Sequence, residues 1–132
     1  MKKTERSAKQ NFELIRSKIL SELDDAKLDH INSYAPTPKY SSRFDNGEPS
    51  ILVENPITKV KVMYDIEVIE DLSPVTLQKW LKHSIECDQL FIVVNFAIKE
   101  KVEAICADQL NNYEILTYDI VTRGRNTSAE IR

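Results

Sequence analysis

The chain has 132 residues, of which 42% are hydrophobic and 30% charged. This size and composition are typical of a single folded domain and not of a disordered or membrane-embedded chain. Its 18 basic and 21 acidic residues give a net charge of −3, which excludes a broadly basic nucleic-acid-binding surface but allows a local basic patch. The only glycines, Gly47 and Gly124, are too few for the glycine-rich phosphate-binding loops of P-loop or dinucleotide-binding enzymes.

The amino terminus, Met1-Lys2-Lys3, runs directly into polar residues, so we expect no secretory signal. The longest uninterrupted apolar run, Leu90 to Val94, is far too short to cross a membrane. Cys87 and Cys106 are the only cysteines. Together these features predict a cytoplasmic protein with reduced thiols and no membrane attachment.

The amino-terminal third of the chain divides into a helix and a long loop. Apolar residues recur at steps of three and four through Ala8, Phe12, Ile15, Ile19 and Leu23, which predicts an amphipathic helix over residues 4 to about 28. Residues 29–49 lose this period and are rich in proline and serine, which predicts a long loop with a short strand near Ile31 to Ala35.

An antiparallel hairpin is predicted next, from strands at Ser50 to Glu54 and Thr58 to Ile69 joined by an Asn-Pro turn. We expect Glu54 to face Lys59, because this register pairs opposite charges. The same register sets Leu52 opposite Lys61, Ser50 opposite Met63 and, if pairing continues, Glu48 opposite Asp65.

The remainder of the chain alternates helices and strands. Ser73-Pro74 predicts the start of a helix that ends near Cys87, and the apolar run Leu90 to Val94 predicts a strand buried on both faces. A helix from about Ile98 to Leu110 and a strand from Tyr113 to Val121 follow. We therefore expect a single α/β domain over residues 1–121, with a mixed sheet and helices on both faces.

Beyond Val121 the sequence shows no hydrophobic period, so residues 122–132 are predicted to form a mobile polar tail. Arg123, Arg125 and Arg132 could contact nucleic acid from this tail, or serve only to solvate it.

The predicted hairpin gathers acidic side chains. Asp65 and Glu67 are two residues apart on one strand, so they project from the same face with Cα atoms about 7 Å apart. With Glu48 they form a candidate site for Mg²⁺ or Mn²⁺, cations that prefer carboxylate oxygens. The alternative is that Glu48 lies in a loop while Asp65 and Glu67 occupy a solvated strand face.

Two segments of the sequence resemble the restriction-endonuclease-like, or PD-(D/E)XK, nuclease superfamily. They are Glu48-Pro49-Ser50-Ile51-Leu52-Val53-Glu54 and Tyr64-Asp65-Ile66-Glu67-Val68, followed by a tryptophan-containing helix. The resemblance implies a metal-dependent nuclease, with Asp65 and Glu67 as catalytic acids that bind the metal and a lysine that orients the attacking water.

The chain departs from this pattern at two positions. Ser50 stands where the metal-binding aspartate is expected after Pro49, and either Glu67 or Ile69 stands where the lysine is expected. The resemblance therefore implies chemistry that is altered or lost, or a lysine that has migrated, for which Lys61 and Lys82 are candidates.

The helix after the hairpin carries further candidates, Gln78, Lys79 and Lys82, which lie beside or opposite its apolar stripe. In similar nucleases this helix borders the catalytic strand, so these residues could approach a phosphate. A solvated polar face is the alternative. On the same helix, His83 and Cys87 could share a zinc ion only if further ligands lay nearby.

The leading hypothesis is a metal-dependent nuclease-like protein that acts on or binds DNA or RNA. The second hypothesis is a catalytically silent protein-interaction module on the same fold, and a homodimer or another protein partner is compatible with either.

Overall fold

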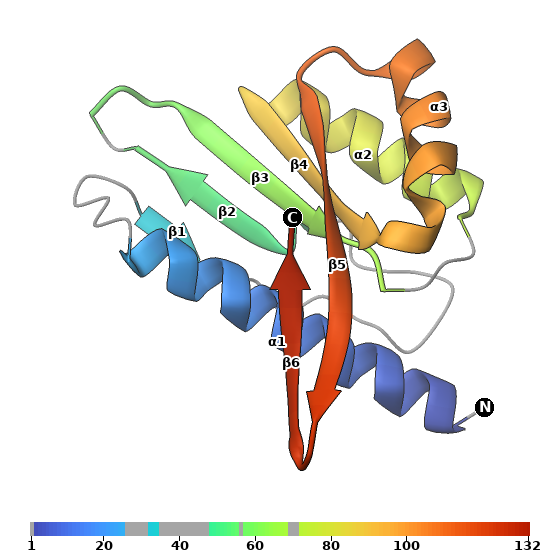
Figure 1. Ribbon diagram of the computed structural model, residues 1–132. Helices are drawn as coiled ribbons and strands as arrows, with labels where there is room; N and C mark the ends of the chain where they lie inside the picture. Colours follow the sequence, from blue (N-terminus) through green and yellow to red (C-terminus); the bar gives the residue numbers. More distant parts are fainter. Residues whose placement is uncertain (1, 26–31, 35–47, 56, 69–71) are drawn as a thin grey trace.

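The computed structural model describes residues 2–25, 32–34, 48–55, 57–68 and 72–132 (Figure 1). In chain order the elements are α1 (Lys2–Asp25), β1 (Asn32–Tyr34), β2 (Ile51–Glu54), β3 (Lys61–Ile66), α2 (Pro74–Glu86), β4 (Gln89–Asn95), the 3-10 helix η1 (Phe96–Ile98), α3 (Lys99–Gln109), β5 (Tyr113–Arg123) and β6 (Asn126–Ile131). The predicted α/β class is confirmed. The expected loop over residues 29–49 lies mostly outside the described residues, apart from β1, which matches the predicted short strand.

The strands form one mixed sheet in the order β1-β2-β3-β4-β5-β6. Neighbours β3, β4 and β5 are parallel, and the remaining pairs are antiparallel. Since α2 connects β3 to β4 and α3 connects β4 to β5, right-handed crossovers place both helices on the same face. Helix α1 covers the opposite face, as its contacts show.

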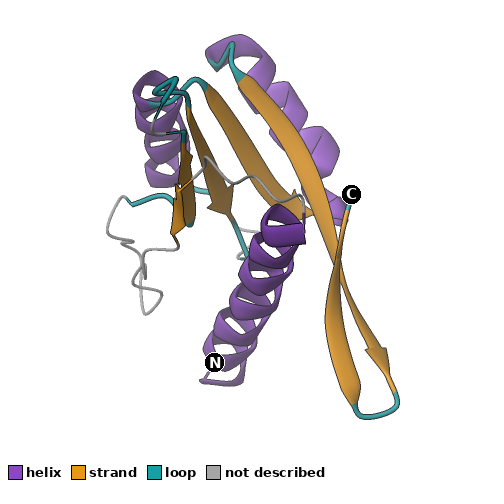
Figure 2. Ribbon diagram, turned by 90° about the vertical axis from the view of Figure 1, so that its left-hand side faces the viewer, coloured by secondary structure: helices purple, strands orange, loops and turns teal. Residues whose placement is uncertain are grey.

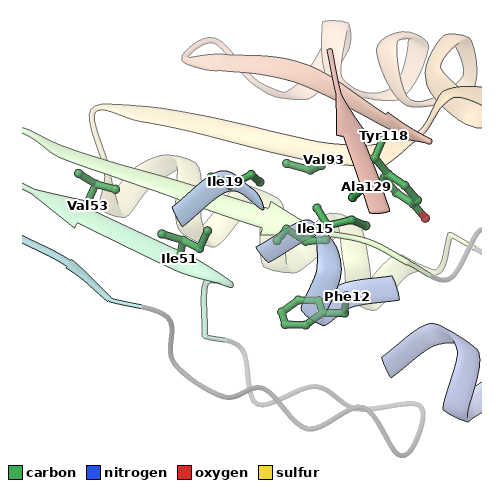
Figure 3. Packing of buried hydrophobic residues seen from close by; sticks show 9 residues of the cluster. Phe12, Ile15, Ile19, Ile51, Val53, Val93, Tyr118 and Ala129 are labelled. Atoms are coloured by element: carbon green, nitrogen blue, oxygen red, sulfur yellow. The ribbon is translucent and has the colours of Figure 1, made fainter. Parts of the chain in front are cut away.

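The α1 face holds the first half of the core. Phe12, Ile15 and Ile19 are buried along one stripe of α1, as predicted, and point into the sheet (Figure 3). They pack in a cluster with residues from the five strands β2 to β6, namely Ile51, Val53, Ile66, Val93, Tyr118 and Ala129. This one helix therefore joins most of the sheet into a single unit.

The second half of the core lies under α2 and α3. Trp80 from α2 and Val102 and Cys106 from α3 pack against alternate residues of β4, which are Leu90, Ile92 and Val94. Val93 of the same strand belongs to the cluster under α1. The prediction of a strand buried on both faces is thus confirmed.

The β2–β3 hairpin forms as predicted, but its predicted register is wrong by two residues. Glu54 lies opposite Lys61 instead of Lys59. The reason is a longer turn: the Asn55 side-chain oxygen accepts hydrogen bonds from the backbone N–H groups of Ile57 and Thr58, and Lys59 adopts a φ of 65°. A shift by two residues preserves which side chains share a face, so the prediction that Asp65 and Glu67 share a face is unaffected.

The prediction of a tail at the carboxyl terminus is also wrong. Residues Asn126–Ile131 form β6, which pairs with an extended β5 from Tyr118↔Ile131 to Arg123↔Asn126. Gly124, with φ +63°, occupies the first position of a two-residue turn, which is the glycine position of a type II′ hairpin. The hairpin escaped prediction because β6 buries only Ala129 among its six residues and therefore lacks an apolar alternation.

Phe12→Ala is expected to lower the free energy of unfolding by about 3–5 kcal/mol, because the ring is fully buried where α1 meets the sheet. Urea unfolding followed by circular dichroism measures the change, with the exposed Lys9→Ala as the control on the same helix. Equal stabilities of the two variants would show that α1 does not hold the sheet together.

Candidate functional site

The candidate site lies at the carboxyl end of β3, beside its parallel neighbour β4 and under α2. Asp65 is the penultimate residue of β3. Glu67 follows the strand and remains extended, since its backbone N–H donates to the Val93 carbonyl oxygen at 2.9 Å. Ligand sites of α/β sheets commonly lie at the carboxyl ends of parallel strands, and both acidic side chains here face α2.

Asp65 is completely buried, which overturns the alternative of a solvated strand face. Its Oδ2 lies 2.6 Å from Nδ1 of His83, a residue of α2 that is itself buried. Its Oδ1 is also buried and has no hydrogen-bond partner within the described ranges. An ionised carboxylate in such surroundings is costly unless it is paired, so His83 is the residue that makes this position tolerable.

Glu67 has two partners on α2. Its Oε2 lies 2.7 Å from the Lys79 ammonium nitrogen and accepts a hydrogen bond of 3.0 Å from the Trp80 indole N–H. The Glu67 and Lys79 side chains are only 13% and 9% exposed. Burial raises the pKa of the Glu67 carboxyl above its ordinary value; the Lys79 charge opposes this rise, and the nearby Asp65 charge adds to it.

Three neighbouring positions on α2 supply all of these partners. Lys79, Trp80 and His83 are related by steps of one, three and four, so they share the helix face that meets the strand. From the sequence, Lys79 lies beside or opposite the apolar stripe of the helix, and His83 has only Cys87 as a suggested partner. The missed signal is that a histidine and a lysine flank the tryptophan at helical spacing, opposite a strand that carries two acids.

The other predicted contacts on this helix lie apart from the acids. Gln78 is exposed, and Lys82 is exposed and lies 4.0 Å from Glu86 one turn later. Cys87 does not join His83 in a metal site, because His83 turns to Asp65 and burial raises the pKa of the Cys87 thiol to about 11.

The predicted pairing of Glu48 with Asp65 is wrong, because it depended on the incorrect register. Glu48 is exposed and precedes β2. Ser50, between them in the chain, is buried, and its hydroxyl oxygen accepts a hydrogen bond of 3.0 Å from the Ile66 backbone N–H. The nuclease resemblance implies an aspartate at this position. Ser50 instead links β2 to β3 beside Asp65 through this hydrogen bond.

Across the described part of the chain, no group of three or more His, Cys, Asp or Glu side chains is arranged to hold a metal ion. Asp65 and Glu67 nevertheless fit a divalent cation such as Mg²⁺ in donor type, since both offer carboxylate oxygens. The buried Asp65 Oδ1 is the clearest sign, because it lacks the partner that a buried oxygen normally has.

No protein-family model matches the chain, and neither does any curated protein or solved structure. None of the described helices is long and apolar enough to span a membrane.

His83→Ala is expected to lower the free energy of unfolding by about 3–5 kcal/mol, because it leaves the Asp65 carboxylate buried without its partner. Asp65→Ala together with His83→Ala should cost less than the sum of the two single changes, since the double variant leaves no group unpaired. Chemical unfolding of the four proteins provides this thermodynamic cycle, with Lys82→Ala on the exposed face of α2 as a control. Strictly additive losses would show that the two side chains are not coupled.

Proposed function

We propose that this chain is a divalent-metal-dependent hydrolase of phosphodiester bonds in nucleic acid, with a site of the restriction-endonuclease-like type. One observation carries the proposal: Lys79 lies 2.7 Å from the carboxylate of Glu67, and Asp65, two residues earlier in the chain, has a buried Oδ1 with no partner among the described residues. Two acids and a lysine at the end of a central strand are the set that the sequence resemblance calls for.

Lys79 supports the proposal because it supplies the lysine that the strand itself lacks. Of the two candidates considered from the sequence, Lys61 begins β3 and so lies about 13 Å along the strand from Asp65. Lys82 is exposed on the outer side of α2. Lys79 instead reaches Glu67 from the inner side of the helix, so the cation comes from α2 in place of the strand.

In this proposal Asp65 and Glu67 would hold Mg²⁺ or Mn²⁺. The bound ion would lower the pKa of a water molecule and neutralise charge on the scissile phosphate. The chain's own residues orient the groups around it: His83 fixes Asp65 through Oδ2, leaving Oδ1 to bind, and Trp80 fixes Glu67 through its indole N–H.

The Lys79 ammonium adds a fixed positive charge at the same place. It lies in a site of low exposure, where a charge acts on a phosphate or an attacking water more strongly than in bulk solvent. Ser50 weakens the site, because its hydroxyl is occupied by the Ile66 backbone and does not replace an aspartate ligand. We therefore expect hydrolysis to be slow.

The proposal predicts slow cleavage of nucleic acid that depends on Mg²⁺ or Mn²⁺ and stops with chelator. Asp65→Ala, Glu67→Ala and Lys79→Met should each reduce the rate by roughly 100-fold or more, as expected for loss of a group that stabilises the transition state. Plasmid, linear duplex and single-stranded substrates are incubated with each purified protein. Lys82→Met is the matched control, since it removes an exposed lysine from the same helix.

A second readout on the same proteins is the shift in unfolding temperature with added metal, which Glu67→Ala should abolish. Cleavage that survives loss of Asp65, Glu67 and Lys79 would place the active site elsewhere. Absence of both cleavage and metal-linked stabilisation would reject the proposal and favour a catalytically silent protein-interaction module.

A further inference from the structure

Strands β5 and β6 continue beyond the rest of the sheet as a two-stranded ribbon. Pairing between β4 and β5 ends at Asn95↔Tyr118, whereas pairing between β5 and β6 continues to Arg123↔Asn126. The ribbon thus extends five residues past the last contact with β4, about 17 Å at the rise of a strand. Both views show it projecting from the body of the molecule (Figures 1 and 2).

The ribbon projects from the edge of the sheet that carries the candidate site. Because β3, β4 and β5 are parallel, the extension of β5 leaves from the same edge at which β3 ends in Asp65 and Glu67. The Tyr118 hydroxyl at the base of the ribbon lies 3.5 Å from the Glu67 carbonyl oxygen. Asp65 pairs with Ile92, and Ile92 pairs with Ile115, so these three side chains lie on one face of the sheet. Arg123 follows Ile115 by an even number of residues on β5, so strand alternation places it on that same face.

The chemistry of the ribbon tip suits a polyanion. The segment from Thr122 to Ser128 contains two arginines and no acid, in a chain of net charge −3. Arg125 is exposed at the turn, and the Arg123 side chain is 83% exposed. Acids lie only nearer the base: Asp119 on β5, and Glu130, which lies 3.8 Å from Arg123 and 3.6 Å from Arg132.

We propose that the β5–β6 ribbon enters the major groove of duplex DNA, with Arg123 and Arg125 against the phosphates. The B-form major groove is about 12 Å wide and admits a two-stranded ribbon, whereas the deep, narrow major groove of A-form RNA does not. The inference deepens the proposed function and rests on it for the link to catalysis. The ribbon would hold the DNA duplex, and the candidate site at the base of the ribbon would cleave it.

The test measures DNA affinity separately from catalysis. Fluorescence anisotropy with a short labelled duplex, in the presence of chelator, compares the wild type with Arg123→Gln/Arg125→Gln. We expect at least a tenfold loss of affinity and a decrease of about two in the slope of log Kd against log salt, since two phosphate contacts are lost. An RNA duplex of the same sequence should bind more weakly to the wild type.

Lys18→Gln/Lys101→Gln is the charge-matched control, because it removes two exposed lysines from α1 and α3. Its affinity should stay near that of the wild type. Arg125→Gln alone tests the turn position with the least risk to folding, and the unfolding temperatures of all variants are measured alongside. We expect the single change to account for about one unit of the slope.

The inference would be overturned by a wild type that does not bind duplex DNA, by ribbon variants that bind as the wild type does, or by equal losses in the lysine control. Equal or tighter binding of RNA would reject the major-groove assignment. Association of two copies along β6 without DNA binding would assign the ribbon to self-pairing instead.

Failure of the ribbon and failure of the catalytic site are distinguishable. If only the ribbon assignment fails, Glu67→Ala still abolishes cleavage while the arginine variants bind DNA normally. If only the catalytic site fails, the arginine variants lose DNA binding although neither metal-linked stabilisation nor cleavage exists.

Discussion

The burial of the Asp65 carboxylate between β3 and α2 is the constraint on which the rest of the structure depends. A carboxylate that is wholly buried in the middle of a sheet requires a partner within hydrogen-bond distance, and His83 provides it at 2.6 Å. This contact fixes the depth and rotation of α2 over β3. Once α2 is held in this way, Lys79 and Trp80 reach Glu67, because the three side chains share one helix face.

Burying ionisable side chains in this way costs desolvation free energy, so stability alone does not explain it. Well-packed apolar residues commonly replace buried ion pairs with little loss or with a gain in stability. Here two acids, a lysine and a histidine meet between the sheet and α2, on the face whose buried cluster, with Trp80, Val102 and Cys106 among its members, is apolar. A chemical role, rather than packing, is the simplest account of their presence, and the position at the carboxyl end of a central strand agrees with it.

Much of the fold could be predicted from local patterns. The spacing of Phe12, Ile15 and Ile19 identified the buried face of α1, and the unbroken apolar run in β4 identified a strand covered on both sides. The register of the hairpin could not be predicted, because it depends on hydrogen bonds from the Asn55 side chain within the turn. Strand β6 was missed because it is an edge strand whose side chains are mostly polar; besides pairing with β5, only Ala129 and Ile131 pack with the cluster under α1.

The candidate site was predictable in part. Two acids at a spacing of two on a strand were sufficient to place Asp65 and Glu67 on one face. Their partners on α2 were signalled only by the helical spacing of Lys79 and His83 about Trp80, and the crossover geometry that turns this helix face toward β3 was needed to identify them. Glu48 was included only through a register that the turn does not allow.

The candidate site and the ribbon lie at the same edge of the sheet, because β3, β4 and β5 are parallel and their carboxyl ends meet there. The central claim is that Asp65 and Glu67 hold a divalent cation there. Crystals grown with Mn²⁺ and measured for anomalous scattering test it most directly. The account predicts a difference peak within coordination distance of Asp65 Oδ1 and the Glu67 carboxylate, absent in crystals treated with chelator. Well-ordered Asp65 and Glu67 side chains with no peak beside them would contradict it.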